Sequence, residues 1–519
     1  MIYQRSSGIL LHPTSLPGPD GIGDLGPEAY RWVDFLHASG TQLWQILPLG
    51  PTGYGDSPYQ CFSAFAGNPF LVSPILLLES GLLKSSDLRQ RPEFPESFVD
   101  FGPVILWKNH LLDRAYENYQ ETKPTDISAR FKQFQIDNAN WLEDYGLFMA
   151  IKEIQGGHPW SDWDKALKFR DQVVLEKMRS KLADVIDKVK FSQFLFDEQW
   201  QNLKNYAHSK GISIIGDMPF VIAMDSADTW ANPQLFLMDN TLTPTMVAGV
   251  PPDYFSATGQ LWGNPLYNWE VHANQQYEWW ASRLGKVLSM VDLVRLDHFR
   301  GFAAAWHVPF GSETAIHGEW IASPGVELFS ALKARLPRLP IIAEDLGVIT
   351  PDVEALRDGF GFPGMKILQF GFSGDPEDSF LPHHYPVNCF AYTGSHDNDT
   401  ARGWFDHASP REQRFCLDYL GTDEVDVPRG MIREVWRSVA NYAVAPMQDF
   451  LGLGTEARMN LPGSASGNWT WRIPQKALID GLKDEIYALN FLYSRLPEDE
   501  KRKNQQRFQS ETSGTVKPH

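Results

Sequence analysis

Three acidic residues stand at or just after short apolar runs of the kind that form buried strands. They are Asp297 in VRLDHFRG, Glu344 in IIAEDLG and Asp397 in TGSHDND. Cleavage of a glycosidic bond needs one protonated carboxyl to assist the leaving oxygen and one ionised carboxylate at the anomeric carbon. A neighbouring carboxylate keeps the acid protonated, because like charges resist joint ionisation. One such residue alone could be a structural ion pair, but three at separate strand ends indicate glycoside chemistry.

Arg295 lies two residues before Asp297. Alternate residues of a strand point to the same side, so the guanidinium and the carboxylate share a side. The arginine would therefore keep Asp297 ionised and oriented. His298 and His307 could also be catalytic, but no Ser or Cys nucleophile signature accompanies them, which favours packing or binding roles.

Six segments have the pattern of buried parallel strands, in which a short apolar run ends in polar residues. They span 41–50, 212–220, 291–299, 340–347, 365–372 and 388–399. Helix-like stretches between several of them indicate crossover connections and a parallel sheet. Polar residues at successive strand ends predict an α/β fold of the TIM (β/α)8 barrel type, because that barrel builds its active face there. A doubly wound open sheet is the competing fold, but no glycine-rich phosphate loop follows the first strand.

Residues 1–495 are expected to form a single catalytic barrel with mainly helical insertions. The segment from about 75 to 200 has apolar residues at helical spacing, which predicts a helical insertion into the barrel. Residues 496–519 are polar and nearly free of apolar side chains, so a disordered tail is expected. The sequence contains no evident metal-ligand cluster, and neither a metal nor a cofactor is expected.

The net charge of −18 over 519 residues argues against nucleic acid or an anionic membrane surface as a partner, because both would repel the protein. Neither a signal peptide nor a long apolar span is evident. Three cysteines without CxxC spacing favour a reducing compartment, so a cytoplasmic location is expected. The 18 Trp, 32 Phe and 17 Tyr suit a carbohydrate protein, because sugar rings stack on aromatic faces, although a large core would also use them.

Several long segments closely resemble the amylomaltase family, the 4-α-glucanotransferases or disproportionating enzymes of glycoside hydrolase family 77. The segments are LHPTSLPGPDGIGDLG (11–26), GDSPYQCFSAFAGNPFLVS (55–73), GDMPFVIAMDSADTWANPQLF (216–236), GVPPDYFSATGQLWGNPLYNW (249–269), VRLDHFRGF (294–302), AEDLGVITPDV (343–353), TGSHDNDT (393–400) and RMNLPGSASGNWTWR (458–472). They follow the family's order from about residue 5 to 475. The resemblance implies a TIM barrel with helical insertions, related to the α-amylases.

The resemblance also implies a role for each matching residue. Asp297 matches the nucleophile, Glu344 the general acid/base, and Asp397 the third acid, which binds and distorts the donor sugar. The binding residues implied in the same way are Ser57, Tyr59, Asp217, Arg295 and His396, with Tyr254, Phe255 and Trp262 in a glucan-covering loop at about 249–262. A purely structural role for Asp217 is about as plausible.

The implied function is a retaining 4-α-glucanotransferase that moves α-1,4-glucan segments between maltooligosaccharides, starch or glycogen chains through a covalent glycosyl-enzyme. Two alternatives remain. A hydrolase of the α-amylase type would use the same acids with water as the acceptor. A non-catalytic glucan-binding protein would be expected to lack at least one of the three acids, and all three are present.

Overall fold

Eight parallel strands form a closed barrel in the computed structural model, which describes residues 5–252, 256–464 and 466–513. The order around the barrel is β10, β11, β12, β1, β2, β3, β6 and β9. A backbone hydrogen bond of 2.9 Å from Ala343 N–H to the Pro363 carbonyl joins β9 to the approach to β10. The strands are β1 (Ser6–Leu10), β2 (Leu43–Gln45), β3 (Ser213–Met218), β6 (Leu293–Leu296), β9 (Ile341–Ala343), β10 (Gly364–Ile367), β11 (Cys389–Tyr392) and β12 (Tyr442–Pro446). The prediction of a TIM barrel is confirmed, and the open sheet is excluded.

Alternation along each strand decides which side chains fill the barrel. Leu43, Ile215 and Leu293 belong to a buried cluster drawn from all eight strands, whereas neighbours such as Trp44 and Ile214 belong to the core under the helices. A side chain from each strand thus packs the interior, and the barrel is not a pore. The same alternation gives Arg295 and Asp297 the inward direction of Leu293.

The six predicted strands are all present; five lie within the predicted ranges, and β10 begins at Gly364, one residue before its predicted range of 365–372. The sequence pattern did not reveal β1 and β12, which complete the barrel. Strand β1 begins with two serines and a glycine, and β12 reads YAVAP, so neither has the run of large branched residues that marks a buried strand. Their pairing partners identify them: β1 lies between β12 and β2, in register from Ser6 opposite Tyr442 to Leu10 opposite Pro446.

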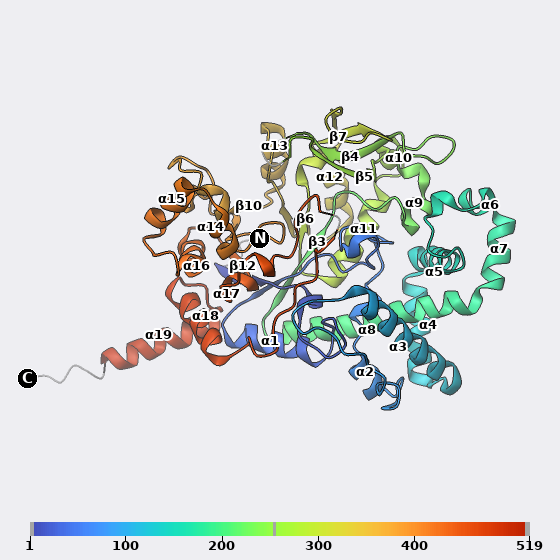
Figure 1. Ribbon diagram of the computed structural model, residues 1–519, viewed down its shortest axis with the longest axis horizontal. Helices are drawn as coiled ribbons and strands as arrows, with labels where there is room; N and C mark the ends of the chain where they lie inside the picture. The colour runs from blue at the N-terminus through green and yellow to red at the C-terminus, as the bar shows by residue number, and fades with distance from the viewer. Residues whose placement is uncertain (1–4, 253–255, 465, 514–519) are drawn as a thin grey trace, which may run out of the picture.

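Helices fill the chain between β2 and β3 and form the blue and teal lobe in Figure 1. They are α2 (Pro74–Glu79), α3 (Phe101–Thr122), α4 (Thr125–Asp137), α5 (Ala139–Ile154), α6 (Lys165–Lys168), α7 (Gln172–Lys181) and α8 (Ala183–Ser209). Helix α8 continues past the predicted limit of about residue 200 because it also packs against the barrel, where Trp200 donates a hydrogen bond to the Met290 carbonyl.

A four-stranded antiparallel sheet with the order β5, β4, β7, β8 stands beside the active face of the barrel. Its strands are β4 (Met246–Val250), β5 (Gln260–Pro265), β7 (Ala304–Pro309) and β8 (Glu319–Ala322). The predicted glucan-covering loop is the connection between β4 and β5, so part of the 249–262 segment is strand. Tyr254 and Phe255 lie outside the described residues.

Most of the other helices cover the barrel from the outside, whereas α9 (Ala227–Ala231) packs against α5 of the helical lobe. These other helices are α1 (Pro27–Ala38), α9, α10 (Trp269–Asn274), α11 (Glu278–Met290), α12 (Gly325–Arg335), α13 (Pro351–Phe360), α14 (Ala401–His407), α15 (Pro410–Leu420), α16 (Val427–Arg437), α17 (Met447–Phe450) and α18 (Asp480–Leu492). The C-terminal helices α14 to α18 lie on the side of the barrel opposite the helical lobe (Figure 1).

The C-terminal segment is attached to both barrel strands that the sequence did not reveal. The guanidinium of Arg495 is fully buried and donates to the carbonyls of Ser6 and Asn441, next to β1 and β12. Beyond it, helix α19 (Glu498–Ser513) occupies part of the tail that is expected to be disordered. Ion pairs at helical spacing, Glu498–Lys501 and Glu500–Lys503, support a helix that has little apolar surface to bury. The helix projects from the body in Figure 1.

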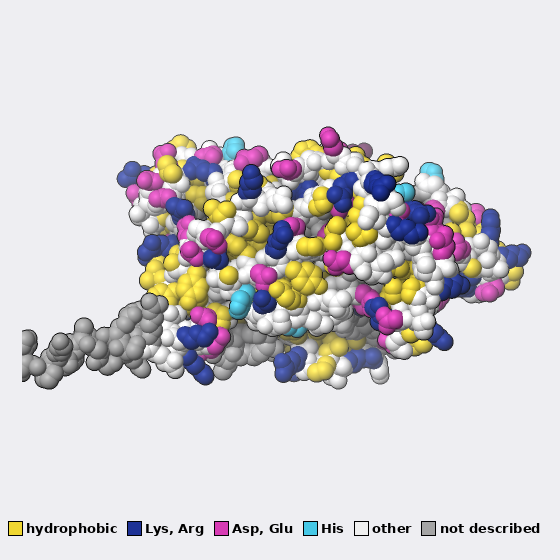
Figure 2. Space-filling model, turned by 90° about the horizontal axis from the view of Figure 1, so that it is seen from below, with side chains coloured by type: hydrophobic (Ala, Val, Ile, Leu, Met, Phe, Trp, Pro, Cys, Tyr) yellow, Lys and Arg dark blue, Asp and Glu magenta, His cyan; other side chains and the backbone are white. Residues whose placement is uncertain are grey.

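Acidic and basic side chains are interspersed over the face of the molecule in Figure 2, among small apolar patches. The negative charge therefore forms no single continuous field on this face. No helix within the described ranges is long and apolar enough to cross a membrane.

Candidate active site

Seven of the predicted site residues come from five separate places in the chain and meet at the carboxyl ends of the barrel strands. Asp217 belongs to β3 and Arg295 to β6, while Asp297 and Glu344 directly follow β6 and β9. His396 and Asp397 lie in the loop after β11, and Tyr59 in the loop after β2. Strands β3, β6 and β9 are neighbours, and their parallel register sets Asp297 level with Glu344 and places Asp217 opposite Arg295, two residues lower.

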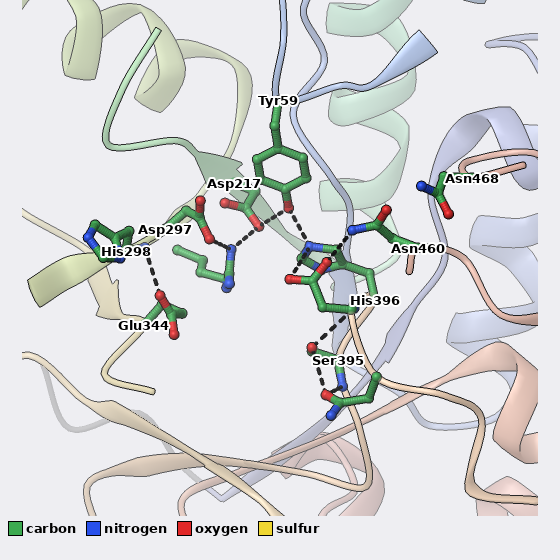
Figure 3. Close-up of polar contacts among 12 residues, drawn as sticks. Tyr59, Asp217, Asp297, His298, Glu344, Ser395, His396, Asn460 and Asn468 are labelled. Atoms are coloured by element: carbon green, nitrogen blue, oxygen red, sulfur yellow. Dashed lines mark hydrogen bonds and ion pairs between the residues drawn. The ribbon is translucent and has the colours of Figure 1, made fainter. Parts of the chain in front are cut away.

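Arg295 joins two carboxylates. Its Nη1 atom lies 2.7 Å from Oδ2 of Asp217 and 2.8 Å from Oδ1 of Asp297 (Figure 3). The Asp217 side chain has no exposed surface, whereas 28% of the Asp297 side chain is exposed. Burial lowers the pKa of Arg295, but the two carboxylates outweigh it and hold that pKa well above its usual value. The arginine is therefore a fixed positive charge that leaves Asp297 accessible to a ligand.

Tyr59 connects Asp217 to the other side of the site. Its hydroxyl donates to Asp217 Oδ2 at 3.0 Å and lies 2.9 Å from Nε2 of His396. The His396 Nε2 atom also lies 3.3 Å from Oδ2 of Asp397. A continuous series of contacts thus runs from Asp297 to Asp397 across the barrel mouth (Figure 3).

These contacts fix the protonation of His396. Since the Tyr59 proton goes to Asp217, the hydrogen bond between Tyr59 and His396 requires a proton on Nε2. The other ring nitrogen, Nδ1, is buried and has no hydrogen-bond partner among the described residues. Burial lowers the pKa of His396, although Asp397 opposes this shift, so the ring is neutral near pH 7. The neutral ring therefore donates its Nε2 proton to the Tyr59 oxygen at 2.9 Å, and Asp397 Oδ2 lies beside the same nitrogen at 3.3 Å.

Glu344 lies in a different environment from Asp297. Its Oε2 accepts a hydrogen bond of 2.7 Å from the His298 backbone N–H, and its Oε1 accepts one of 3.1 Å from the Leu346 N–H. Desolvation raises the pKa of Glu344 well above its usual value, and the charge of Asp297 adds to that rise against the lowering effect of Arg295. The two carboxyl groups are thereby suited to different tasks, a proton donor and an anion.

The covering loop contributes Trp262, whose ring meets the His298 ring edge-on at a centroid distance of 4.8 Å. His298 has a left-handed backbone, with φ of 53°, which turns its N–H toward Glu344. Burial lowers the pKa of the His298 ring to about 4. Ser57 lies behind Tyr59 and accepts the Tyr59 N–H at 3.2 Å, so it shapes the loop that carries the tyrosine.

Two residues in contact with Asp397 were missed by the sequence analysis. Asn460 donates to Asp397 Oδ1 at 2.6 Å, and Arg458 donates to the Asp397 carbonyl at 2.6 Å. Both lie in RMNLPG, which the sequence analysis used only as a signature of resemblance. Their separation of about 60 residues from Asp397 left no local pattern to connect them.

A family model described as 4-alpha-glucanotransferase matches residues 11–477. The chain belongs to that family. The 4-alpha-glucanotransferase of Thermus thermophilus is 49% identical over 91% of this chain and 95% of its own length. The 4-alpha-glucanotransferase of Synechocystis is 48% identical over 95% of this chain and 99% of its own length. A solved amylomaltase from Streptococcus agalactiae, in complex with acarbose, matches with a TM-score of 0.92 and 39% identity over 95% of this chain and all of that one.

Membership of the family confirms the resemblance stated from the sequence motifs. The protein is an enzyme of the 4-alpha-glucanotransferase type, which transfers segments of glucan. The hydrolase is not favoured, because the family and the relatives are all described as transferases.

Proposed function

We propose that the enzyme disproportionates α-1,4-glucans, such as maltooligosaccharides and chains of starch or glycogen, with retention at the anomeric carbon and through a covalent bond to Asp297. One observation carries the proposal. The exposed Asp297 carboxylate is paired with a buried arginine, while the pKa of the neighbouring Glu344 is raised. A retaining glycosyl transfer requires this division between a nucleophile and an acid.

In the first step, Glu344 donates its proton to the glycosidic oxygen as an oxygen of Asp297 attacks the anomeric carbon. The bond from that carbon to the leaving oxygen breaks, and the leaving chain departs with a free 4-hydroxyl. Arg295 orients the attacking carboxylate through its 2.8 Å contact. Tyr59 offers an aromatic ring to the donor sugar, and His396 and Asp397 bind its hydroxyls.

In the second step, Glu344 is ionised and takes the proton from the 4-hydroxyl of an acceptor glucan. The acceptor oxygen displaces Asp297 from the anomeric carbon, which restores both carboxyl groups and the α configuration. Glu344 regains its proton in each cycle because its surroundings disfavour the charged form.

Transfer requires a sugar hydroxyl to reach the intermediate before water does. Trp262 packs against His298, next to both Asp297 and Glu344, and so can cover the acceptor side. Pro251 and Pro252 stiffen the entry to the covering loop. An acceptor sugar stacked on this aromatic side chain would exclude water from the ester.

The test is incubation of the enzyme with maltotriose alone. Glucose together with a ladder of longer oligosaccharides, at a nearly constant number of reducing ends, is the expected result. An Asp297→Asn variant that is folded but inactive completes the test, since an amide is too poor a nucleophile to form the ester. A steady rise in reducing ends without longer products would overturn the proposal in favour of hydrolysis.

A further inference from the structure

The loop that carries His396 and Asp397 is closed by one buried carboxylate. Asp449, which follows β12 in helix α17, is 2% exposed. Its Oδ2 atom accepts the Thr393 hydroxyl at 2.5 Å, and its Oδ1 atom accepts the Ala401 N–H at 2.7 Å. Thr393 directly follows β11 and Ala401 is the first residue of α14, so the two oxygens bind the two ends of the loop.

The opposite flank of the loop is held by the exit of β10. The Gln369 N–H donates to the Thr393 carbonyl at 3.3 Å, and its side-chain amide donates to the Asp399 carbonyl at 2.9 Å. Strand β11 lies between β10 and β12 in the barrel, so Gln369 and Asp449 hold its loop from both neighbours. Gly394 allows the close approach, since a Cβ there would lie 2.7 Å from the Gln369 amide nitrogen.

We propose that Asp449 is a positioning residue for the reaction: by fixing the distance between residues 393 and 401, it places Asp397 and His396 opposite Asp297. Asp449 touches neither of these two site residues in the contacts described above. It acts through the loop alone. The inference rests on the proposed function, in which Asp397 and His396 hold the donor sugar.

The decisive variant is Thr393→Val, which removes the hydroxyl but keeps the size of the side chain. Loss of one end of the closure should lower kcat on maltotriose about tenfold with little change in KM, because a small displacement weakens contacts that matter most in the transition state. Thr393→Ser keeps the hydroxyl and should recover most of the rate. The kcat of Asp449→Ala, which releases both ends of the loop, should be lower than that of Thr393→Val.

Thermal unfolding of each variant controls for folding, and rates are expressed per folded enzyme. Asp20→Asn is the matched control. Asp20 is also a buried carboxylate with two donors, Arg91 and Trp107, but it ties the N-terminal loop to helix α3 and contacts no site residue. This variant should lose stability while kcat stays within twofold. Thr393→Ala is the second deletion if the valine variant does not fold.

A double-mutant cycle separates positioning from a general loss of stability. With an α-maltosyl fluoride donor, Thr393→Val should lower the rate of the otherwise wild-type enzyme but cause a much smaller further loss in an Asp397→Asn background, because both changes act largely through Asp397. Independent, multiplying losses would overturn the inference, as would a folded Thr393→Val with the kcat of the wild type. If Asp397→Asn alone left the activity unchanged, the proposed function would fail instead.

Discussion

Asp217 and Asp297 share a single nitrogen of Arg295, at 2.7 Å and 2.8 Å, yet only Asp297 is open to solvent. One carboxylate is therefore a structural counter-ion and the other is available for chemistry. Asp217 neutralises the buried charge of Arg295. Asp297 can therefore leave the ion pair and form a bond to a sugar while Arg295 keeps a partner of opposite charge.

Asp217→Asn tests this division. The amide keeps the shape but removes the negative charge from a side chain with no exposed surface, so the stability should fall by about 3 kcal/mol. Arg295 should then hold Asp297 more strongly, and kcat should fall at least about tenfold. Urea unfolding and initial rates on maltotriose measure the two effects. Asp34→Asn, at an exposed pair with Lys210, is the control and should change neither. Wild-type stability and rate in Asp217→Asn would contradict the assignment.

The pH dependence of the enzymatic activity should reflect the ionisation of Glu344. The acid must be protonated to act in the first step, and its pKa is raised above its usual value by burial and by Asp297. Activity should therefore be retained well above pH 4.5 and lost as the pH rises through the raised pKa. The measurement is kcat/KM for maltotriose across the pH range. With an α-maltosyl fluoride donor, single-turnover loading of Asp297 should lack this basic limb, because fluoride needs little protonic help. If activity fell at the same basic pH with both donors, the loss would have to be assigned to a group other than Glu344.

Glu344→Gln should trap the intermediate. Positioned acid–base catalysis contributes about 10²–10⁴-fold to the rate, so the variant should cleave natural oligosaccharides more slowly than the wild type by about this factor. A maltosyl fluoride should still load Asp297, and the second step should stall because nothing activates the acceptor. Intact-protein mass spectrometry should reveal the added sugar, and peptide mapping should locate it on the peptide containing Asp297. An adduct on another peptide would show that the nucleophile is misassigned.

Trp262→Ala should shift the balance from transfer toward hydrolysis. The indole covers His298 next to Asp297 and Glu344, and its removal should admit water and weaken acceptor stacking. The ratio of new reducing ends to transferred chains is the measurement. Trp269→Ala, which alters the aromatic packing around Tyr267 and Trp280 away from the acids, serves as the control. If this ratio were equal in both variants and the wild type, Trp262 would not be responsible for favouring transfer over hydrolysis.

The sequence predicted those parts of the structure that leave a local pattern. Apolar runs ending in polar residues located six strands, and Asp297 and Glu344 are neighbours because the paired parallel strands β6 and β9 end at one face. Strand β12, with its short YAVAP sequence, has no such pattern and is a strand because β1 and β11 pair with it. The low hydrophobicity of the tail predicts disorder, whereas its charged pairs at helical spacing support helix α19.

The contacts that position the site could not be predicted in this way. Asp449 and Asn460 act on the loop around Asp397 from about 50 and 60 residues further along the chain. A single sequence has no periodicity at such distances. These partners became visible only when the barrel brought the exits of β11 and β12 side by side.

The pairing of β1 with β12 affects the folding of the chain during its synthesis as well as its final structure. The first strand leaves the ribosome early, but one of its two partner strands is encoded more than four hundred residues later. At about 5–20 residues per second, β1 waits about 20–90 s with one edge unpaired. Arg495, which binds the carbonyls of Ser6 and Asn441, emerges later still. Completion of the barrel therefore comes late in synthesis, and the growing chain carries β1 with one edge unpaired until β12 emerges.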